Sequence, residues 1–251
     1  GPLAEALADV DEVYEALVLG LRDYVEKNGF RELLLGISGG VDSGLTAALA
    51  VEALGPERVT LVSMPSRYSS TGTRTDAERT AGLLGTRFLE LPIEPIVGVF
   101  DTALAEPFEG TAPGLAEENV QARIRGVLLM ALSNKFGWLL VATGNKSEYS
   151  VGYATLYGDM AGGFALLKDV FKTDVFRLSR YLNERAGREL VPWSVIERPP
   201  SAELRADQKD EDSLPPYDVL DDVLERYVER DMSRDELVDA GYDRELVDRV
   251  A

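Results

Sequence analysis

The chain has 251 residues, of which 45% are apolar and 8% aromatic, which is enough for the core of one α/β domain with additions. It has no cysteine and no histidine, so disulfides, thiolate metal sites and catalysis by either residue are excluded, and Asp, Glu, Lys, Tyr, Ser or Thr must supply any acid–base or metal chemistry. The formal net charge is −18, of which residues 203–251 contribute −10, and a polyanion such as nucleic acid is therefore not an expected partner.

The N-terminal region begins with Gly1-Pro2, which we interpret as a remnant of tag removal and leave out of the fold. It carries no secretory signal, and no apolar run in the chain approaches the roughly 20 residues of a membrane span, so we expect a cytoplasmic protein with no membrane partner. Residues 4–27 predict one long helix, because apolar residues such as Leu7 and Leu21 recur at spacings of three and four and Asn28-Gly29 is typical of a helix end.

Strands and helices alternate between residues 32 and 106. Continuous apolar runs predict strands at 32–37, 58–64 and 88–93. Each strand is followed by a helical segment, at 41–55, 73–85 and 94–106. Thr75 and Glu78 have the spacing of a capping box in the second of these helices.

The second half of the chain repeats this alternation and then changes character. Residues 116–137 predict a long helix, 138–144 a strand and 172–187 a further helix. Residues 199–215 are rich in proline and charge and predict a mobile loop. The remaining residues, 216–251, predict an acidic helical extension with helices at 217–231 and 233–243, whose charges we interpret mainly as solvated helix faces; Ser233 and Glu236 have capping-box spacing.

This alternation indicates an α/β fold with a doubly wound parallel sheet and helices on both faces. Polar turns follow three of the strands and read GISGG, SMPSR and ATGNKSE. Because sheets of this kind bind ligands at the carboxyl ends of their strands, we expect the three turns to converge on one crevice.

Residues 36–44, GISGGVDSG, form a glycine-rich turn between a strand and a helix. Such a turn exposes backbone N–H groups at a helix N-terminus and is suited to bind phosphate. Ser38 and Ser43 add hydroxyl donors, whereas Asp42 fits beside phosphate only with a cation between them, for which Mg²⁺ is the natural choice. The turn matches neither GxxxxGK[ST] nor GxGxxG. The alternative is a tight turn that caps a helix.

The string SGGVDS resembles the signature of ATP pyrophosphatases, which cleave ATP between its α- and β-phosphates. The segments beginning ENVQARIRG, TGNKSEYSVGYATLYGDMAGG and PPSAELRADQKDED narrow the resemblance to NAD synthetase, in particular to the synthetase half of the glutamine-dependent enzymes. The similarity runs from about residue 33 to residue 248. It implies a Rossmann-like fold of the adenine nucleotide alpha hydrolase type and one synthetase domain over residues 1–251.

The resemblance also implies a reaction. In the family, the nicotinate carboxylate of deamido-NAD attacks the α-phosphate of ATP, an enzyme-bound adenylate forms, pyrophosphate leaves, and ammonia then displaces AMP to give NAD⁺. Adenylation supplies the leaving group that a carboxylate lacks. The protein must neutralise the polyphosphate and exclude water from the adenylate, which needs no histidine.

The resemblance implies a role for particular residues of this chain. Asp42 and Glu148 match the family's Mg²⁺-binding carboxylates, and Asp42 and Lys172 are the residues expected to take part in catalysis. The positions expected to bind ATP are Gly36, Ile37, Ser38, Gly39, Gly40, Val41, Asp42, Ser43, Thr143, Lys172 and Ser201. The positions expected to bind deamido-NAD are Asn119, Arg125, Glu148 and Asp159. The loop 199–215 resembles one that orders over the substrates, with Lys209 near phosphate.

Each of these residues also has a structural interpretation. Glu148 fits a first-turn helix carboxylate, Lys172 a solvated lysine, and Arg125 a partner of Glu117 or Glu118. The segment 199–215 fits a disordered linker equally well. Three tyrosines fit two interpretations equally well, as core residues or as a wall of the dinucleotide site: Tyr149, Tyr153 and Tyr157.

The chain departs from parts of the family pattern. Leu156 and Gly163 stand where many ammonia-dependent synthetases have a lysine and an aspartate, as in the glutamine-dependent type. The chain stops at Ala251, before the basic C-terminal segment that contacts deamido-NAD in the family. Without cysteine it lacks the nucleophile of a glutaminase, so we expect it to use free ammonia or to work with a glutaminase domain or subunit.

The resemblance predicts a homodimer, and helix 116–136 is apolar enough to be either its interface or core. Two other functions remain open: another ATP pyrophosphatase such as a GMP synthetase, which should not share GYATLYGDMAGG, and a truncated nucleotide-binding domain without turnover.

Overall fold

The computed structural model describes residues 9–205 and 208–251. Its centre is one parallel sheet with the strand order β3-β2-β1-β4-β5. The strands are β1 (Leu33–Gly36), β2 (Val59–Ser63), β3 (Arg87–Glu90), β4 (Leu139–Ala142) and β5 (Phe164–Ala165). The order reverses between β1 and β4, and this is where a doubly wound sheet opens a crevice at its carboxyl edge.

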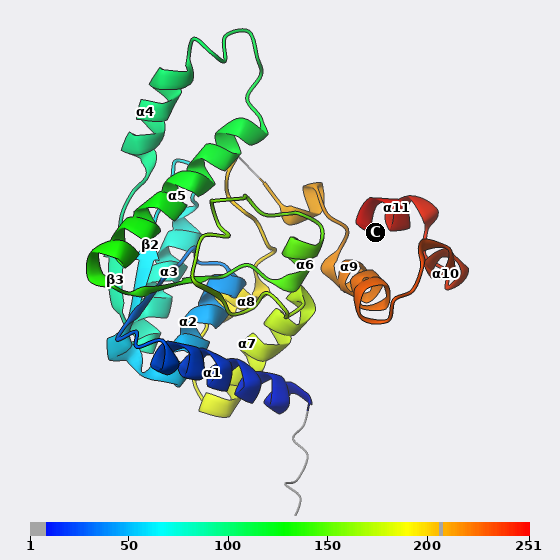
Figure 1. Cartoon of the computed structure of the whole chain (residues 1–251), viewed down its shortest axis with the longest axis horizontal. Helices are drawn as coiled ribbons and strands as arrows, with labels where there is room; N and C mark the ends of the chain where they lie inside the picture. Colours follow the sequence, from blue (N-terminus) through cyan, green and yellow to red (C-terminus); the bar gives the residue numbers. More distant parts are fainter. Residues whose placement is uncertain (1–8, 206–207) are drawn as a thin grey trace, which may run out of the picture.

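Alternate residues of β1 enter two different cores, one on each face of the sheet. Leu33 and Leu35 pack on the first face and Leu34 on the second. The first face is covered by α1 (Asp9–Lys27), α2 (Val41–Leu54), α3 (Thr71–Leu84), α7 (Lys172–Ala186) and α8 (Trp193–Glu197). The second is covered by α4 (Glu94–Leu104) and α5 (Leu115–Phe136). The expected doubly wound parallel sheet is therefore confirmed (Figure 1).

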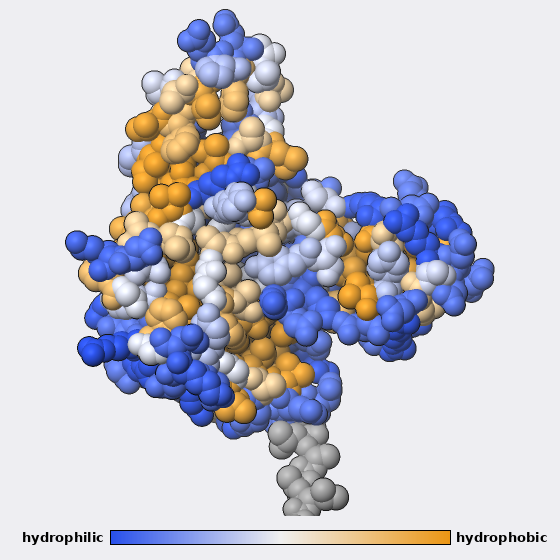
Figure 2. Space-filling view, viewed as in Figure 1, coloured by the Kyte–Doolittle hydropathy of each residue, from blue (hydrophilic) through white to orange (hydrophobic). Residues whose placement is uncertain are grey.

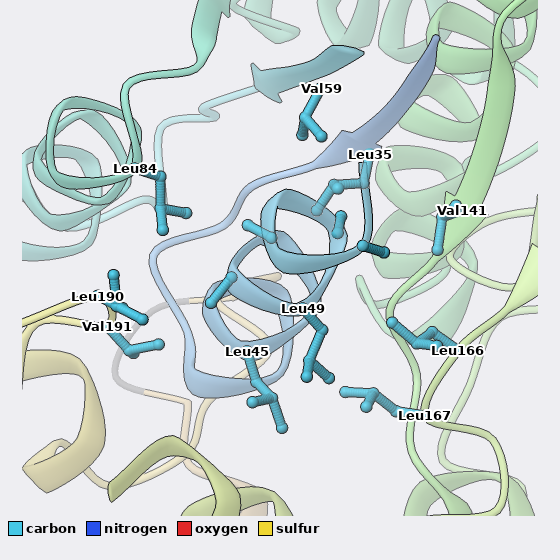
Figure 3. Packing of buried hydrophobic residues seen from close by; sticks show 14 of the residues in the cluster. Leu35, Leu45, Leu49, Val59, Leu84, Val141, Leu166, Leu167, Leu190 and Val191 are labelled. Atoms are coloured by element: carbon cyan, nitrogen blue, oxygen red, sulfur yellow. The ribbon is translucent and has the colours of Figure 1, made fainter. Parts of the chain in front are cut away.

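Helix α2 lies in the middle of the first core. Leu45 and Leu49 on this helix are fully buried, and Leu49 points towards Leu167 in the segment after β5, while Leu35 of β1 lies on the opposite side of the helix (Figure 3). Because α2 is apolar over most of its circumference, it must be surrounded by other elements. This central packing holds its N-terminus, and the glycine-rich turn in front of it, at the carboxyl edge of the sheet.

The C-terminal helices extend from the side of this domain (Figure 1). The short helix α6 (Lys146–Ser150) contacts the first of these helices, and the 3₁₀ turn η2 (Asp210–Asp212) precedes it in the chain. The C-terminal elements are α9 (Tyr217–Leu224), the π-helical turn η3 (Glu225–Glu229), α10 (Arg234–Asp239) and α11 (Arg244–Val250). The extension has small apolar clusters of its own, around Leu220 and around Leu237. The far end of the extension has a largely hydrophilic surface (Figure 2).

Several expected boundaries were wrong. Helix α3 begins at Thr71 with Ser70 as its N-cap, so Thr75 lies inside the helix and does not cap it. Ser233 and Glu236 do form the predicted capping box. The segment 217–231 loses α-helical geometry after Leu224. The segment 233–243 contains only α10, because the chain turns at Gly241, and a second helix, α11, follows.

The first residues of the predicted helix 4–27, including Leu7, lie outside the described residues, as does Gly1-Pro2. Short elements that were not predicted include α6, β5, α8 and α11. Within the described part of the chain, none of the helices combines the length and apolar character that crossing a membrane requires.

Candidate active site

The glycine-rich turn between β1 and α2 is held by its two serines. Ser38 Oγ accepts a hydrogen bond from the Gly40 N–H at 3.1 Å, and Ser43 Oγ accepts one from the Ser38 N–H at 3.2 Å. Gly39 has φ of +84°, and a Cβ atom there would lie 2.1 Å from the Thr73 carbonyl oxygen. Only glycine fits this position, because it tolerates positive φ and leaves room for α3.

The N-terminus of α2 has no side-chain cap, since its N-cap residue is Gly40. The turn is therefore more than a helix cap, and the first N–H groups of α2 are left for another acceptor. Residues 36–43 line a cleft with a cavity volume of about 300 Å³. Residues after β2 and β4, including Met64 and Thr143, line the same cleft, so the predicted convergence of the three turns is confirmed.

Lys172, the first residue of α7, joins the two predicted metal ligands. Its Nζ lies 2.5 Å from Asp42 Oδ2 and 3.1 Å from Glu148 Oε1. Only 2% of Lys172 is exposed, which rules out the solvated lysine considered above. Asn145 donates to Asp42 Oδ1 at 2.7 Å, while its own side-chain oxygen caps α6 by accepting from the Glu148 N–H at 3.0 Å. One short helix and its cap thus position both carboxylates.

Burial changes the protonation of this cluster. It raises the pKa of Glu148 to about 7, against the lowering effect of Lys172, and the charge of Asp42 adds to the increase. Burial by itself lowers the pKa of Lys172, but Asp42 and Glu148 raise it well above its ordinary value. The lysine therefore stays charged and compensates the two acids.

The two carboxylates of this cluster are too few to hold a metal with protein ligands alone, but they are suited to Mg²⁺. Mg²⁺ commonly takes one or two carboxylates and completes its shell with water and substrate phosphates. Asp42 and Glu148 supply two carboxylates at the cleft, beside the phosphate-type turn. In residues 9–205 and 208–251, no group of three or more acidic side chains has the arrangement of a metal site.

Asp210, which was not predicted as a site residue, lies at the same cleft and is only 4% exposed. It accepts hydrogen bonds from Tyr217 at 2.8 Å and from Tyr153 at 3.3 Å. The ring of Tyr217 lies 5.1 Å from Lys172 Nζ, so residues from the loop and from α9 complete the surroundings of the lysine.

The predicted deamido-NAD residues are distributed around α5 and the segment after α6. Arg125 and Asp159 line the cleft, whereas Asn119 does not. Asn119 instead accepts a hydrogen bond from Thr155 Oγ1 at 2.8 Å, and the Thr155 N–H donates to Asp159 at 2.9 Å. Asn119 and Asp159 are thus linked through Thr155, and Asn119 reaches the cleft wall only through that link.

Arg125 does not pair with Glu117 or Glu118 in the structure. Its Nε donates to the Met64 carbonyl oxygen at 3.0 Å, and burial lowers its pKa to about 10. Within the described residues, no carboxylate lies within ion-pair distance of this guanidinium. A half-buried cation at a cleft wall is suited to bind an anionic substrate group.

The loop 199–215 contacts the domain at several points. Glu203 accepts from Thr73 Oγ1 at 2.8 Å, and the Leu204 carbonyl accepts from Gln121 at 2.9 Å. Ser201 lines the cleft, but its hydroxyl donates to the Gln208 carbonyl at 2.5 Å. Residues 206–207 lie outside the described residues, and the mobility of the loop stays a prediction. Lys209 is exposed and does not line the cleft.

The tyrosines divide between two environments. Tyr149 and Tyr153 line the cleft, which supports their place in a substrate wall. Tyr157 does not line the cleft, is 77% exposed and has φ of +64°. Arg198 is a cleft residue that sequence patterns did not reveal. It pairs with Asp76 and donates to the Gly39 carbonyl at 3.2 Å, which ties the glycine-rich turn to α3 and α8.

A sequence model described as NAD synthase matches residues 13–251. The chain belongs to the NAD synthase family. A family relative, the glutamine-dependent NAD(+) synthetase of Thermotoga maritima, is 51% identical over 237 residues, covering 94% of this chain and 41% of that protein. The chain thus spans less than half the length of this curated relative.

Solved structures of family members have the same fold. The glutamine-dependent NAD⁺ synthetase of Acinetobacter baumannii in complex with adenosine diphosphate matches with a TM-score of 0.77 and 47% identity, covering 100% of this chain and 45% of that chain. An NH3-dependent NAD synthetase of Campylobacter jejuni matches with a TM-score of 0.75 and 26% identity, covering 97% of this chain and 92% of that chain. The expected resemblance and fold are therefore confirmed.

Proposed function

We propose that this chain amidates deamido-NAD to NAD⁺ with ATP and ammonia, releasing AMP and pyrophosphate through an adenylated deamido-NAD. The observation that carries the proposal is the cluster of Lys172, Asp42 and Glu148 directly beside the glycine-rich turn of a NAD synthase family chain. The cluster keeps a buried cation between two half-buried carboxylates at the cleft, and such a group of charges, partly removed from water, is typical of a functional site.

The positions of the groups support the following roles. The N-terminus of α2 and the backbone N–H groups of the turn that are not hydrogen-bonded to Ser38 or Ser43 hold the departing β- and γ-phosphates. Asp42 and Glu148 would hold Mg²⁺, which would neutralise polyphosphate charge. Lys172 contacts the phosphates and stabilises the negative charge that develops as the nicotinate carboxylate attacks the α-phosphate. Arg125 and Asp159 orient the nicotinate half of the dinucleotide.

Water must be kept from the adenylate until ammonia displaces AMP. The loop 199–215 lies along the cleft through Ser201, Glu203 and Asp210 and is suited to cover it. Ser201 and Thr143 contribute hydroxyl groups to ATP, once the Ser201 hydroxyl leaves the Gln208 carbonyl.

The nitrogen donor in the proposal is ammonia. The chain has no cysteine and so no thiol nucleophile with which to hydrolyse glutamine. The Campylobacter synthetase, described as NH3-dependent, is matched over 92% of its length, whereas the Thermotoga relative, described as glutamine-dependent, is matched over 41%. A glutaminase domain or subunit is thus a proposed partner.

We also propose a homodimer. Val127 and Met130 on α5 are exposed by 67% and 37%. Leu156 and Met160, exposed by 58% and 41%, belong to a turn that α5 contacts through Gly126. Figure 2 shows hydrophobic surface over α4 and α5. A second copy of the chain is a suitable cover for such a patch.

The proposal is tested by measuring AMP and NAD⁺ with ATP, Mg²⁺, deamido-NAD and either ammonium or glutamine. We expect NAD⁺ from ammonium and none from glutamine, and a loss of at least about 100-fold in Asp42→Ala, because that substitution removes a metal ligand. ATP binding without AMP formation would instead indicate a nucleotide-binding domain without turnover. AMP formation only with xanthosine monophosphate as acceptor would indicate a GMP synthetase.

A further inference from the structure

Helix α9 of the C-terminal extension places a buried carboxylate against the start of α7. Asp221 is only 5% exposed. Its Oδ2 accepts a hydrogen bond from the Thr173 N–H at 2.8 Å, and its Oδ1 accepts one from Ser147 Oγ at 2.5 Å. Asp221 thus contacts α7 directly and α6 through Ser147.

The same serine completes the contact to Lys172. Ser147 is fully buried, and its Oγ accepts a hydrogen bond from the Lys172 N–H at 2.8 Å. The N-cap residue of α7, Phe171, has no side chain able to do this. Asp221 and Ser147 together therefore satisfy the first two N–H groups of α7, which every helix leaves without an intrahelical partner.

This capping concerns the residue that the cleft depends on. Lys172 is the first residue of α7, so the direction in which its side chain leaves the backbone is set by the hydrogen bonds of Lys172 and Thr173. Ser147 stands next to Glu148, so the same network also holds α6, the helix that supplies a carboxylate to Lys172. The negative charge of Asp221 further suits a helix N-terminus.

Asp221 has no cation to offset its burial. Within residues 9–205 and 208–251 it forms no ion pair, and its hydrogen bonds come from Thr173 and Ser147. Each oxygen of the Asp221 carboxylate faces a hydrogen-bond donor. An asparagine in its place would turn its NH₂ group towards one of these donors and lose that hydrogen bond.

We propose that Asp221 is a positioning residue for the amidation reaction, which caps α7 and thereby holds the Lys172 ammonium at the ATP phosphates. The proposal rests on the proposed function, and it makes α9 part of the active site. Tyr217, one turn earlier on α9, supports this assignment, because its ring also contacts the Lys172 ammonium.

The test compares Asp221→Asn with Asp222→Asn in the full chain. Asp222 is the next residue on α9, and Asp222→Asn removes the same charge. The Asp222 side chain, however, pairs with Arg226 and Tyr242, away from the cleft. We expect Asp221→Asn to lower kcat for NAD⁺ formation by about 10- to 100-fold, because small displacements of a catalytic group are costly, with KM for deamido-NAD little changed. Asp222→Asn should keep the wild-type kcat.

Two further measurements separate positioning from loss of folding. Asp221→Glu, which keeps the carboxylate, should recover part of kcat, and amide hydrogen exchange at Lys172 and Thr173 should be faster in Asp221→Asn than in Asp222→Asn. An unchanged kcat in a folded Asp221→Asn protein overturns the proposal, as does a loss that merely follows the fraction unfolded.

The proposed function can fail separately. If wild-type protein makes no NAD⁺, ATP binding measured by calorimetry with Mg²⁺ replaces kcat, because Lys172 still faces the cleft. A weaker ATP affinity in Asp221→Asn than in Asp222→Asn then supports the positioning role, and equal affinities in the two variants overturn it.

Discussion

At the scale of single residues, the site depends on a charge balance that the chain reaches without histidine. Lys172, Asp42 and Glu148 come from three elements and form one group, in which the lysine is buried and the two carboxylates are half-buried. The sequence context identified Asp42, Glu148 and Lys172 as candidate site residues. It did not predict that they contact one another or that Asn145 binds Asp42. The Asn145–Asp42 and Lys172–Asp42 contacts join residues 103 and 130 positions apart in the chain.

The raised pKa of Glu148 predicts a pH dependence of Mg²⁺ binding. Burial raises this pKa to about 7, so the free protein carries a growing fraction of protonated Glu148 as the pH falls through neutrality. A metal ligand must lose its proton to bind, and so lower pH opposes binding. We expect the Mg²⁺ concentration for half-maximal NAD⁺ formation to rise as the pH is lowered from about 8 to about 6.

The matched control for this experiment is Glu148→Gln, in which the dependence on pH over this range should flatten while Mg²⁺ binds more weakly throughout. A half-saturating Mg²⁺ concentration that stays constant over the range in the wild type contradicts the prediction.

At the scale of secondary-structure elements, the glycine pattern of the turn between β1 and α2 agrees with how its neighbouring elements pack. The strand before it is short and buried, and the helix after it is buried on most sides, so the turn has little freedom. Gly39 has the positive φ and the close contact with Thr73 that only glycine allows. The pattern of glycines indicated a phosphate turn, and the contact with α3 explains why one of them is indispensable.

Gly39→Ala should destabilise the fold by about 1–3 kcal/mol or more, because the new Cβ meets positive φ and the Thr73 carbonyl. The control is Gly82→Ala within α3, where a Cβ meets nothing within 4 Å and the change should stabilise by up to about 1 kcal/mol. Urea unfolding of the two variants measures both. Equal stability of Gly39→Ala and wild type would show that the turn relaxes freely.

At the scale of the whole molecule, the exposed apolar surface is uneven. Val127 and Met130 on α5 and Leu156 and Met160 after α6 are exposed apolar side chains. Figure 2 shows hydrophobic surface over α4 and α5, while the far end of the extension is hydrophilic. The sequence left open whether helix 116–136 was interface or core. In the structure the helix contributes Ile124 to the core and leaves Val127 exposed, so an interface through this helix stays a proposal.

Val127→Glu should therefore convert a dimer into a monomer of 27.4 kDa in sedimentation equilibrium, because a buried interfacial charge without a partner costs several kcal/mol. Leu19→Glu is the control, since Leu19 is 57% exposed on α1, on the other face of the sheet. If wild type sediments as a monomer at high concentration, the proposed homodimer is wrong.

The sequence by itself determined the fold class, the order of the main strands and helices, and the location of the phosphate-type turn. These depend on local periodicity and on short motifs, which are written in neighbouring residues. It also supplied the family, through long distinctive segments. It misplaced the start of α3 and missed α6, β5, α8 and α11, because such short elements have too little periodicity to detect.

Only the tertiary structure decided that Lys172 is buried between Asp42 and Glu148. It also decided that Arg125 donates to the Met64 carbonyl and does not pair with Glu117 or Glu118. The capping of α7 by Asp221 is the third such contact. Each of these contacts joins residues that are distant in the chain. Their geometry is set by how whole helices pack on the sheet, and no local pattern records it, because the same residue in the same local pattern is solvated or buried according to what packs above it.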